Sequence, residues 1–139
     1  MVHALRRAAG RLRAGGTLIS IRPHPSQRPL VAIVTDRRRL PVATLLETAF
    51  ERNLDAAESA LRRVVEDGAF NLAGVRSGRF RTYLERPSQM RTYLELIYPP
   101  RPRFPPGGRA RLYEMWDAAP PGARIEVTES LILNALRRR

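Results

Sequence analysis

The segment Leu5–Pro25, with the sequence LRRAAGRLRAGGTLISIRPHP, constrains the fold more than any other part of the chain. Apolar residues recur at helical spacing opposite a face of arginines, which predicts a basic amphipathic helix over Val2–Arg13. Gly15 and Gly16 are typical of a helix stop, and Thr17–Ile21 is a short apolar strand of the kind that is buried on both faces. A helix that leads directly into such a strand is typical of a wound α/β sheet.

The overall composition narrows the class of protein. The chain has 139 residues, 43% of them hydrophobic, which is enough to form one domain with a buried core. Cysteine is absent, which excludes disulfides and thiolate metal sites and favours a cytoplasmic location. No apolar run approaches the roughly 20 residues that span a bilayer, and no apolar stretch typical of a secretory signal follows Arg6 and Arg7. We therefore expect no membrane partner.

The chain is strongly basic, with a net charge of +12, and all 25 of its basic residues are arginine. A basic surface attracts phosphate backbones or anionic lipid, and arginine suits such partners because its guanidinium binds phosphate in a bidentate fork. The alternative is a solvated face without a specific partner, since most arginines are scattered along the chain. Two groups stand together, Arg37–Arg39 in an expected turn and Arg137–Arg139 at the C-terminal end.

The middle of the chain predicts a hairpin and a helix. Leu30–Thr35 and Val42–Phe50 flank a polar turn and predict a β-hairpin, although residues 43–52 are also compatible with a helix. Asn53 as N-cap and Gly68 as stop then delimit a helix with a single apolar stripe. We expect this helix to pack on the core.

Two further helices, separated by a proline-rich linker, follow an extended stretch over Ala69–Leu84. Pro87 precedes a helix over Ser88–Tyr98. The sequence YPPRPRFPPGG cannot continue a regular element, so residues 99–108 are interpreted as an internal linker. Arg109–Ala118 then predict a short helix.

The C-terminal segment predicts a strand in the middle of a sheet. Ile125 and Val127 alternate with Glu126 and Thr128, which is typical of a half-exposed strand, whereas Leu131–Leu133 is apolar without a break. We expect this strand to be exposed on one face at first and buried on both faces later.

Three of these segments resemble parts of the class I S-adenosylmethionine-dependent methyltransferases. LRRAAGRLRAGGTLISIRP is similar to the segment that leads into the fifth strand of that family. The helix Asn53–Asp67 followed by GAFNLAGVRSGRFRTYL resembles the last crossover helix and the sixth strand. ARIEVTESLILNALRR resembles the seventh strand, which in that family lies antiparallel between the fifth and the sixth.

The resemblance implies an α/β protein with a partial Rossmann-like methyltransferase fold. Its sheet would be mixed, with the antiparallel C-terminal strand between the two others, and the β-hairpin would be an addition to it. Residues 1–139 would form a single domain equivalent to the C-terminal half of the family fold.

The resemblance does not extend to the half of the fold that holds the cofactor. In that family a glycine-rich turn after the first strand and an acidic residue after the second bind S-adenosylmethionine, in the manner of Rossmann-type sheets. Here Gly15 and Gly16 precede their strand, and Gly74 and Gly78 lie within one, so we assign no cofactor-binding residue. We expect a methyltransferase-like protein that is inactive alone and binds S-adenosylmethionine only if the missing half is supplied.

An apolar strand at Thr17–Ile21 without its usual neighbour would leave a bare sheet edge, which is prone to aggregate. We therefore expect self-association, or a partner subunit, to cover this edge. The expected hairpin is a third candidate to cover it.

Five residues are candidates for functional sites. Arg22 and His24 follow the first strand at the end where α/β sheets bind ligands, so the resemblance places them on the substrate side, although a lone histidine is commonly only solvent-exposed. Arg79, Arg81 and Tyr83 share one face of a strand and could stack on and clamp a nucleic-acid strand. The alternative for this second group is a cation-rich face that keeps a sheet edge soluble.

Two competing functions therefore follow from the sequence. One is the C-terminal region of a methyltransferase-like protein, and the other is a small basic nucleic-acid-binding or assembly protein. The two histidines, His3 and His24, give no pattern of metal ligands. Glu126 and Glu129 are an odd number of residues apart on a strand, hence on opposite faces, so they do not suggest paired acid and base catalysis.

Overall fold

The computed structural model describes residues 1–46, 48–97 and 101–139. These residues contain both helices and strands, which gives the α/β composition that the sequence predicts. In chain order the elements are α1 (Val2–Arg11), β1 (Thr17–Pro23), β2 (Leu30–Val34), β3 (Arg39–Thr44), α2 (Thr48–Glu66), β4 (Phe70–Leu84), α3 (Gln89–Leu96), α4 (Gly108–Asp117) and β5 (Arg124–Arg138).

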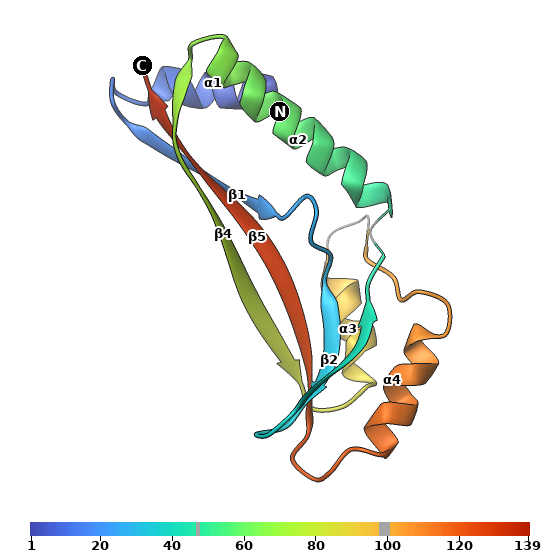
Figure 1. Ribbon diagram of the computed structural model, residues 1–139. Helices are drawn as coiled ribbons and strands as arrows, with labels where there is room; N and C mark the ends of the chain where they lie inside the picture. The colour runs from blue at the N-terminus through green and yellow to red at the C-terminus, as the bar shows by residue number, and fades with distance from the viewer. Residues whose placement is uncertain (47, 98–100) are drawn as a thin grey trace. The chain divides into compact units, whose positions relative to one another are not determined.

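The five strands form one sheet in which β5 is the central strand (Figure 1). The order is β1-β5-β2-β3, and β4 pairs with β5 as well. The C-terminal strand therefore lies between β1 and β4, as expected. The expectation of a mixed sheet is wrong, because neighbouring strands in the described sheet are antiparallel. A hairpin pairs its own two strands antiparallel, and β2 of this hairpin also pairs antiparallel with β5, so the hairpin extends the antiparallel pattern of the sheet.

The chain divides into two compact units, each built from separate stretches of sequence. The first unit comprises Met1–Pro25, Glu51–Gly78 and Leu131–Arg139, and the second comprises Ser26–Phe50 and Arg79–Ser130. β4 and β5 contribute residues to both. Each unit has a hydrophobic core of its own, and a single domain over residues 1–139 stays a prediction.

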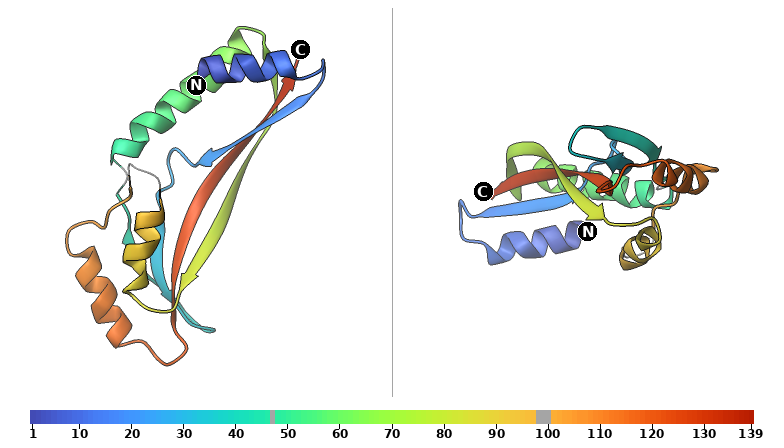
Figure 2. Two further views of the ribbon diagram at one scale, coloured as in Figure 1. Left: turned by 180° about the vertical axis from the view of Figure 1, so that it is seen from behind. Right: turned by 90° about the horizontal axis from the view of Figure 1, so that it is seen from below.

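The core of the first unit forms where α1 and α2 pack on β1, β4 and the second half of β5 (Figure 2). Both helices contribute the apolar stripe that their sequence predicts. The buried side chains of this core are Leu5, Ala9, Ala60, Leu61, Val64, Phe70 and Leu136.

Helix α2 ends at its predicted stop but begins earlier than predicted. Gly68 has a φ of +74°, its N–H donates to the carbonyl of Val65, and the Ala69 N–H donates to the carbonyl of Val64. This pair of bonds is a Schellman motif, so the stop is confirmed. Asn53 is not an N-cap, because the helix starts at Thr48. Of the two alternatives for residues 43–52, the helix is correct for residues 48–52. The strand alternative is correct only as far as Thr44, where β3 ends.

Gly15 and Gly16 do not stop helix α1. The helix ends at Arg11, and its C-cap Leu12 is already extended. Gly15, with a φ of +73°, instead lies in the turn into β1, where its N–H donates to the carbonyl of Arg138 over 3.1 Å. The Arg138 N–H donates in return to the Gly16 carbonyl over 2.8 Å. The two glycines therefore connect the turn to β5.

The expected burial of β1 on both faces is wrong. Ile19 and Ile21 are 55% and 60% exposed. The helices of the first unit pack on the face of β1 that carries Leu18, and the described residues leave the opposite face with Ile19 and Ile21 uncovered. The pattern along β5 is also the reverse of the expected one, since Ile125–Val127 is buried and Leu131–Leu133 is only half-buried.

The core of the second unit forms between the β2–β3 hairpin, the first half of β5, and helices α3 and α4. Both helices and the presence of the hairpin are confirmed, but the second strand of the hairpin spans Arg39–Thr44 and not the predicted Val42–Phe50. The buried residues of this core are Val31, Ile33, Val42, Leu45, Met90, Leu94, Leu112, Ala123, Ile125 and Val127.

The described part of the proline-rich linker is attached to this unit by backbone hydrogen bonds. Residues 99 and 100 lie outside the described residues. Leu46 and Arg103 form an isolated bridge, with N–H to carbonyl distances of 2.7 and 2.9 Å. In the part of the chain that the structure describes, no helix has the length and apolar character needed to cross a membrane.

Candidate functional site

A buried carboxylate, Glu126, lies at the centre of a polar cluster in the second unit. The residue is only 4% exposed. It alternates along β5 with Ile125 and Val127, which pack into the core, so its side chain points to the opposite face of the strand. Glu129 accepts a hydrogen bond from Tyr93 of α3, in agreement with the expectation that the two glutamates occupy opposite faces.

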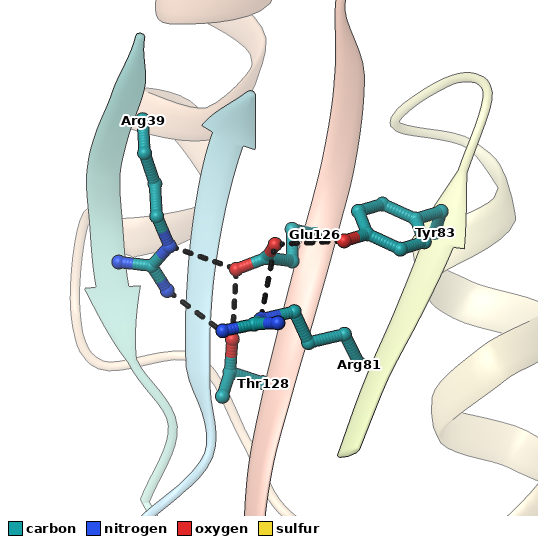
Figure 3. A network of polar contacts seen from close by, with 5 residues as sticks. All are labelled: Arg39, Arg81, Tyr83, Glu126 and Thr128. Atoms are coloured by element: carbon teal, nitrogen blue, oxygen red, sulfur yellow. Dashed lines mark hydrogen bonds and ion pairs between the residues drawn. The ribbon is translucent and has the colours of Figure 1, made fainter. Parts of the chain in front are cut away.

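Four side chains from three strands contact the Glu126 carboxylate (Figure 3). Arg39 Nε and Thr128 Oγ1 each donate to Oε1 over 2.8 Å. Tyr83 Oη donates to Oε2 over 3.2 Å, and Arg81 Nε forms an ion pair with Oε2 at 3.5 Å. Arg39 Nη2 also donates to Thr128 Oγ1 over 3.2 Å. A single carboxylate thus fixes two guanidinium groups and one aromatic ring.

These contacts keep Glu126 charged. Burial of the carboxyl raises its pKa, but the hydrogen bonds from Arg39, Thr128 and Tyr83, together with the positive charge of Arg39, outweigh burial and lower the pKa below its usual value. The site therefore holds a carboxylate with its hydrogen-bonding capacity occupied by residues of the same chain.

Tyr83 is held in place but remains accessible. Its hydroxyl is bound to Glu126, and the guanidinium carbon of Arg124 lies 4.6 Å from the ring centroid, a cation–π contact. The residue is nevertheless 43% exposed. A fixed and partly exposed ring of this kind can accept a second planar group by stacking.

Arginines line two hollows around this cluster, and Arg39 borders both. One hollow, of about 440 Å³, is lined by Gln27, Arg28, Leu30, Arg39, Arg79, Arg81, Thr128 and Ser130. The other, of about 370 Å³, is lined by Val34, Thr35, Asp36, Arg37, Arg38, Arg39, Tyr83, Gly122, Arg124 and Glu126. Seven arginines and two carboxylates therefore face these hollows, a local excess of positive charge. We call the residues that line these two hollows, Tyr83 included, the arginine surface.

The structure brings the strand candidates Arg79, Arg81 and Tyr83 together in this region. Arg81 and Tyr83 contact the same carboxylate, and Arg79 lines a hollow with Arg81. All three residues are exposed.

The other two candidates, Arg22 and His24, lie in the first unit. Arg22 is buried, donates through Nη1 to Asn134 Oδ1, and pairs through Nη2 with Glu58 of α2. Its Nε has no hydrogen-bond partner among the described residues. His24 is half-buried and directly follows β1. The Arg22 guanidinium is thus paired within the chain, and a substrate-side role of Arg22 and His24 stays a prediction.

Several members of the arginine surface were not candidates from the sequence, namely Arg28, Arg39, Arg124, Glu126 and Thr128. The alternation of Glu126 with Ile125 and Val127 indicated the correct face of the strand but predicted an exposed carboxylate. The charged turn at residues 37–39 was a partial signal for Arg39. Its contact with Glu126 joins residues 87 positions apart, which no local pattern encodes.

Comparison of the chain with protein-family models, curated proteins and solved structures finds no match. Among the described residues, no group of three or more histidine, aspartate or glutamate side chains is placed to hold a metal ion.

Proposed function

We propose that the second unit binds a nucleic-acid strand through the arginine surface. The observation that carries this proposal is the pair of hollows that share Arg39, whose lining among the described residues comprises seven arginines and two carboxylates. A phosphate backbone carries regularly spaced negative charges, so it can engage several guanidinium groups of such a surface at once.

The contacts of Glu126 support this proposal because they order the basic side chains before a ligand arrives. A free arginine loses rotamer entropy when it binds, and a side chain that is already fixed loses less. Glu126 fixes Arg39 and Arg81 in this way, and it neutralises only part of the charge around it.

Tyr83 favours a single strand over a duplex as the ligand. Bases of a single strand are free to stack on an exposed aromatic ring, and stacking of this kind contributes about 1–3 kcal/mol per base. Arg124 covers one side of the Tyr83 ring, so a base would stack on the exposed part and extend an existing cation–π pair.

The test is fluorescence anisotropy with a short labelled single-stranded oligonucleotide over a series of salt concentrations. We expect affinity to fall steeply with salt. In the double variant Arg79→Gln/Arg81→Gln we expect weaker binding and a shallower dependence of affinity on salt. The slope of the logarithm of the binding constant against the logarithm of the salt concentration should decrease by about 0.7 for each phosphate that the variant no longer binds.

The matched control is Arg109→Gln/Arg111→Gln on α4, which removes the same charge from exposed positions that line neither hollow. We expect its affinity to stay close to that of the wild type. An equal loss in both double variants would show general charge attraction and would contradict a defined surface.

A second pair of variants tests the role of the ring. Tyr83→Ala should weaken binding of the single strand by roughly ten-fold, because one base can no longer stack. Tyr83→Phe loses the hydrogen bond to Glu126 but keeps the ring, so we expect most of the affinity to remain. Equal affinities for the Ala and Phe variants would exclude stacking on Tyr83.

The second candidate is the C-terminal region of a methyltransferase-like protein, and one observation favours it. β5 lies antiparallel between β1 and β4, which is the arrangement implied for the last three strands of that family. On this proposal the cofactor site needs a further polypeptide segment, so we expect no binding when S-adenosylmethionine is titrated into this chain in a calorimeter. Micromolar binding by the chain alone would overturn it.

A further inference from the structure

The second unit contains another hollow, which we call the hairpin pocket. It has a volume of about 470 Å³ and lies between the turn of the β2–β3 hairpin and the end of α4. Its lining residues are Ile33, Thr35, Arg37, Arg38, Leu40, Met115, Ala118, Ala119 and Pro120. This volume falls within the range of pockets that hold small molecules.

The walls of the hairpin pocket are mostly apolar. Ile33 is buried at its base and belongs to the core of the unit. Leu40 is 47% exposed although it is a large apolar side chain, and Met115 of α4 is half-buried. A ligand with an apolar body would remove this exposed surface from water, which favours its binding.

The polar groups of the hairpin pocket are concentrated at the hairpin turn and are basic. Arg37 and Arg38 line the pocket, and its lining in the described part of the chain includes no carboxylate. The backbone of the turn is fixed, because Thr35 Oγ1 accepts from the N–H groups of Arg37 and Arg38 over 3.3 and 3.1 Å. The Thr35 N–H also donates to the Arg38 carbonyl over 2.9 Å. The Cα positions from which the side chains of Arg37 and Arg38 extend are therefore fixed by the backbone of the turn.

We propose that the hairpin pocket binds a small amphipathic carboxylate, such as a medium-chain fatty acid. The carboxylate lies against Arg37 and Arg38, and the apolar body lies against Leu40, Met115 and Ala119.

This site overlaps the proposed nucleic-acid interface at Arg37 and Arg38, but its apolar walls lie outside that interface. Leu40, Met115, Ala118 and the residues after α4 line the hairpin pocket alone. Variants of these residues therefore separate the two proposals.

The test uses decanoate as the probe and the methyl signals of the three methionines as the readout. In a protein labelled at its methionine methyl groups, we expect saturable shifts at Met115 on titration with decanoate. Met90 is buried in the same core, so its signal should move little and reports that the unit stays folded. Decyltrimethylammonium, which has the same chain and the opposite charge, should bind at least ten-fold more weakly.

Ala118→Trp should fill the hairpin pocket, lower the affinity for decanoate at least ten-fold, and leave oligonucleotide binding unchanged. Ala110→Trp is the matched control, because Ala110 is exposed in α4, the helix that ends directly before Ala118, and does not line the pocket. The proposal is overturned if Met115 does not respond, if Ala118→Trp binds decanoate as well as Ala110→Trp, or if the ammonium probe binds as tightly as decanoate.

Discussion

Glu126 sits among basic and hydroxyl side chains that favour its ionised form, and this has a consequence for stability. A group whose pKa is lower in the folded than in the unfolded chain stabilises the fold above the unfolded pKa. That contribution is lost as the pH falls from the usual value of 4.5 through the lower pKa of the folded state. Stability of the second unit should therefore depend on pH in the acidic range.

We expect the free energy of unfolding of the wild type to fall as the pH drops below about 4.5, and Glu126→Gln to lack this component. At neutral pH the substitution should cost about 1–3 kcal/mol, because the charge-assisted hydrogen bond and ion pair from the two arginines are lost. Urea denaturation across the acidic range measures both effects.

Glu114→Gln, at an exposed position of α4, is the control for the change from glutamate to glutamine. Its pH profile should follow that of the wild type. Identical acid profiles for Glu126→Gln and the wild type would show that Glu126 does not have the role inferred from its contacts.

Helix α2 shows how one element ends. Gly68 adopts a φ of +74°, a region that side chains with a Cβ rarely occupy, and it completes the Schellman motif after Glu66. We expect Gly68→Ala to lower the free energy of unfolding by about 1 kcal/mol, measured by chemical denaturation.

Gly74→Ala in β4 is the matched comparison, because its φ is not positive and a Cβ there would meet no atom within 4 Å. This substitution should be neutral or slightly stabilising, since alanine restricts the unfolded chain more than glycine does. A loss at Gly74→Ala as large as at Gly68→Ala would mean that the backbone conformation at Gly68 is not the cause.

At the scale of the whole molecule, β1 leaves an apolar strand accessible. Ile19 and Ile21 are exposed, and within the described sheet β1 pairs with β5 alone. Exposed apolar edge strands promote association between chains. Coverage of Thr17–Ile21 by a second copy or another subunit therefore stays a prediction.

We expect the wild-type chain to show a concentration-dependent rise in mass in sedimentation experiments. Ile19→Lys/Ile21→Lys should reduce this rise, because charge on an edge strand opposes pairing. Leu96→Lys, at another exposed apolar position, should not reduce it. A wild-type chain that stays monomeric at high concentration would contradict self-association through β1.

Some features of this protein follow from its sequence because the interactions that create them are local. Three such features are present, and each depends on residues a few positions apart: the apolar stripe of α2, the end of that helix at Gly68, and the β2–β3 hairpin. The start of α2 could not be read in the same way. Asn53 is a good capping residue, but the helix continues through it to Thr48.

The candidate site was predicted only in part for the same reason. The alternation along β4 correctly indicated Arg79, Arg81 and Tyr83 as neighbours. It could not indicate Glu126, Arg39 or Thr128, which come from other strands and meet these residues only through the pairing of β2, β3, β4 and β5.

The α/β character, most of the local elements, the strong positive charge and a central C-terminal strand can be predicted from the amino-acid sequence. The antiparallel pairing, the exposure of Ile19 and Ile21, and the burial of Glu126 among arginines become visible only in the folded chain. Helical and strand periodicity records which face of an element is apolar. Burial and charge pairing depend instead on which elements become neighbours in the fold. The contact between Arg39 and Glu126, 87 positions apart in the sequence, is an example that no local pattern contains.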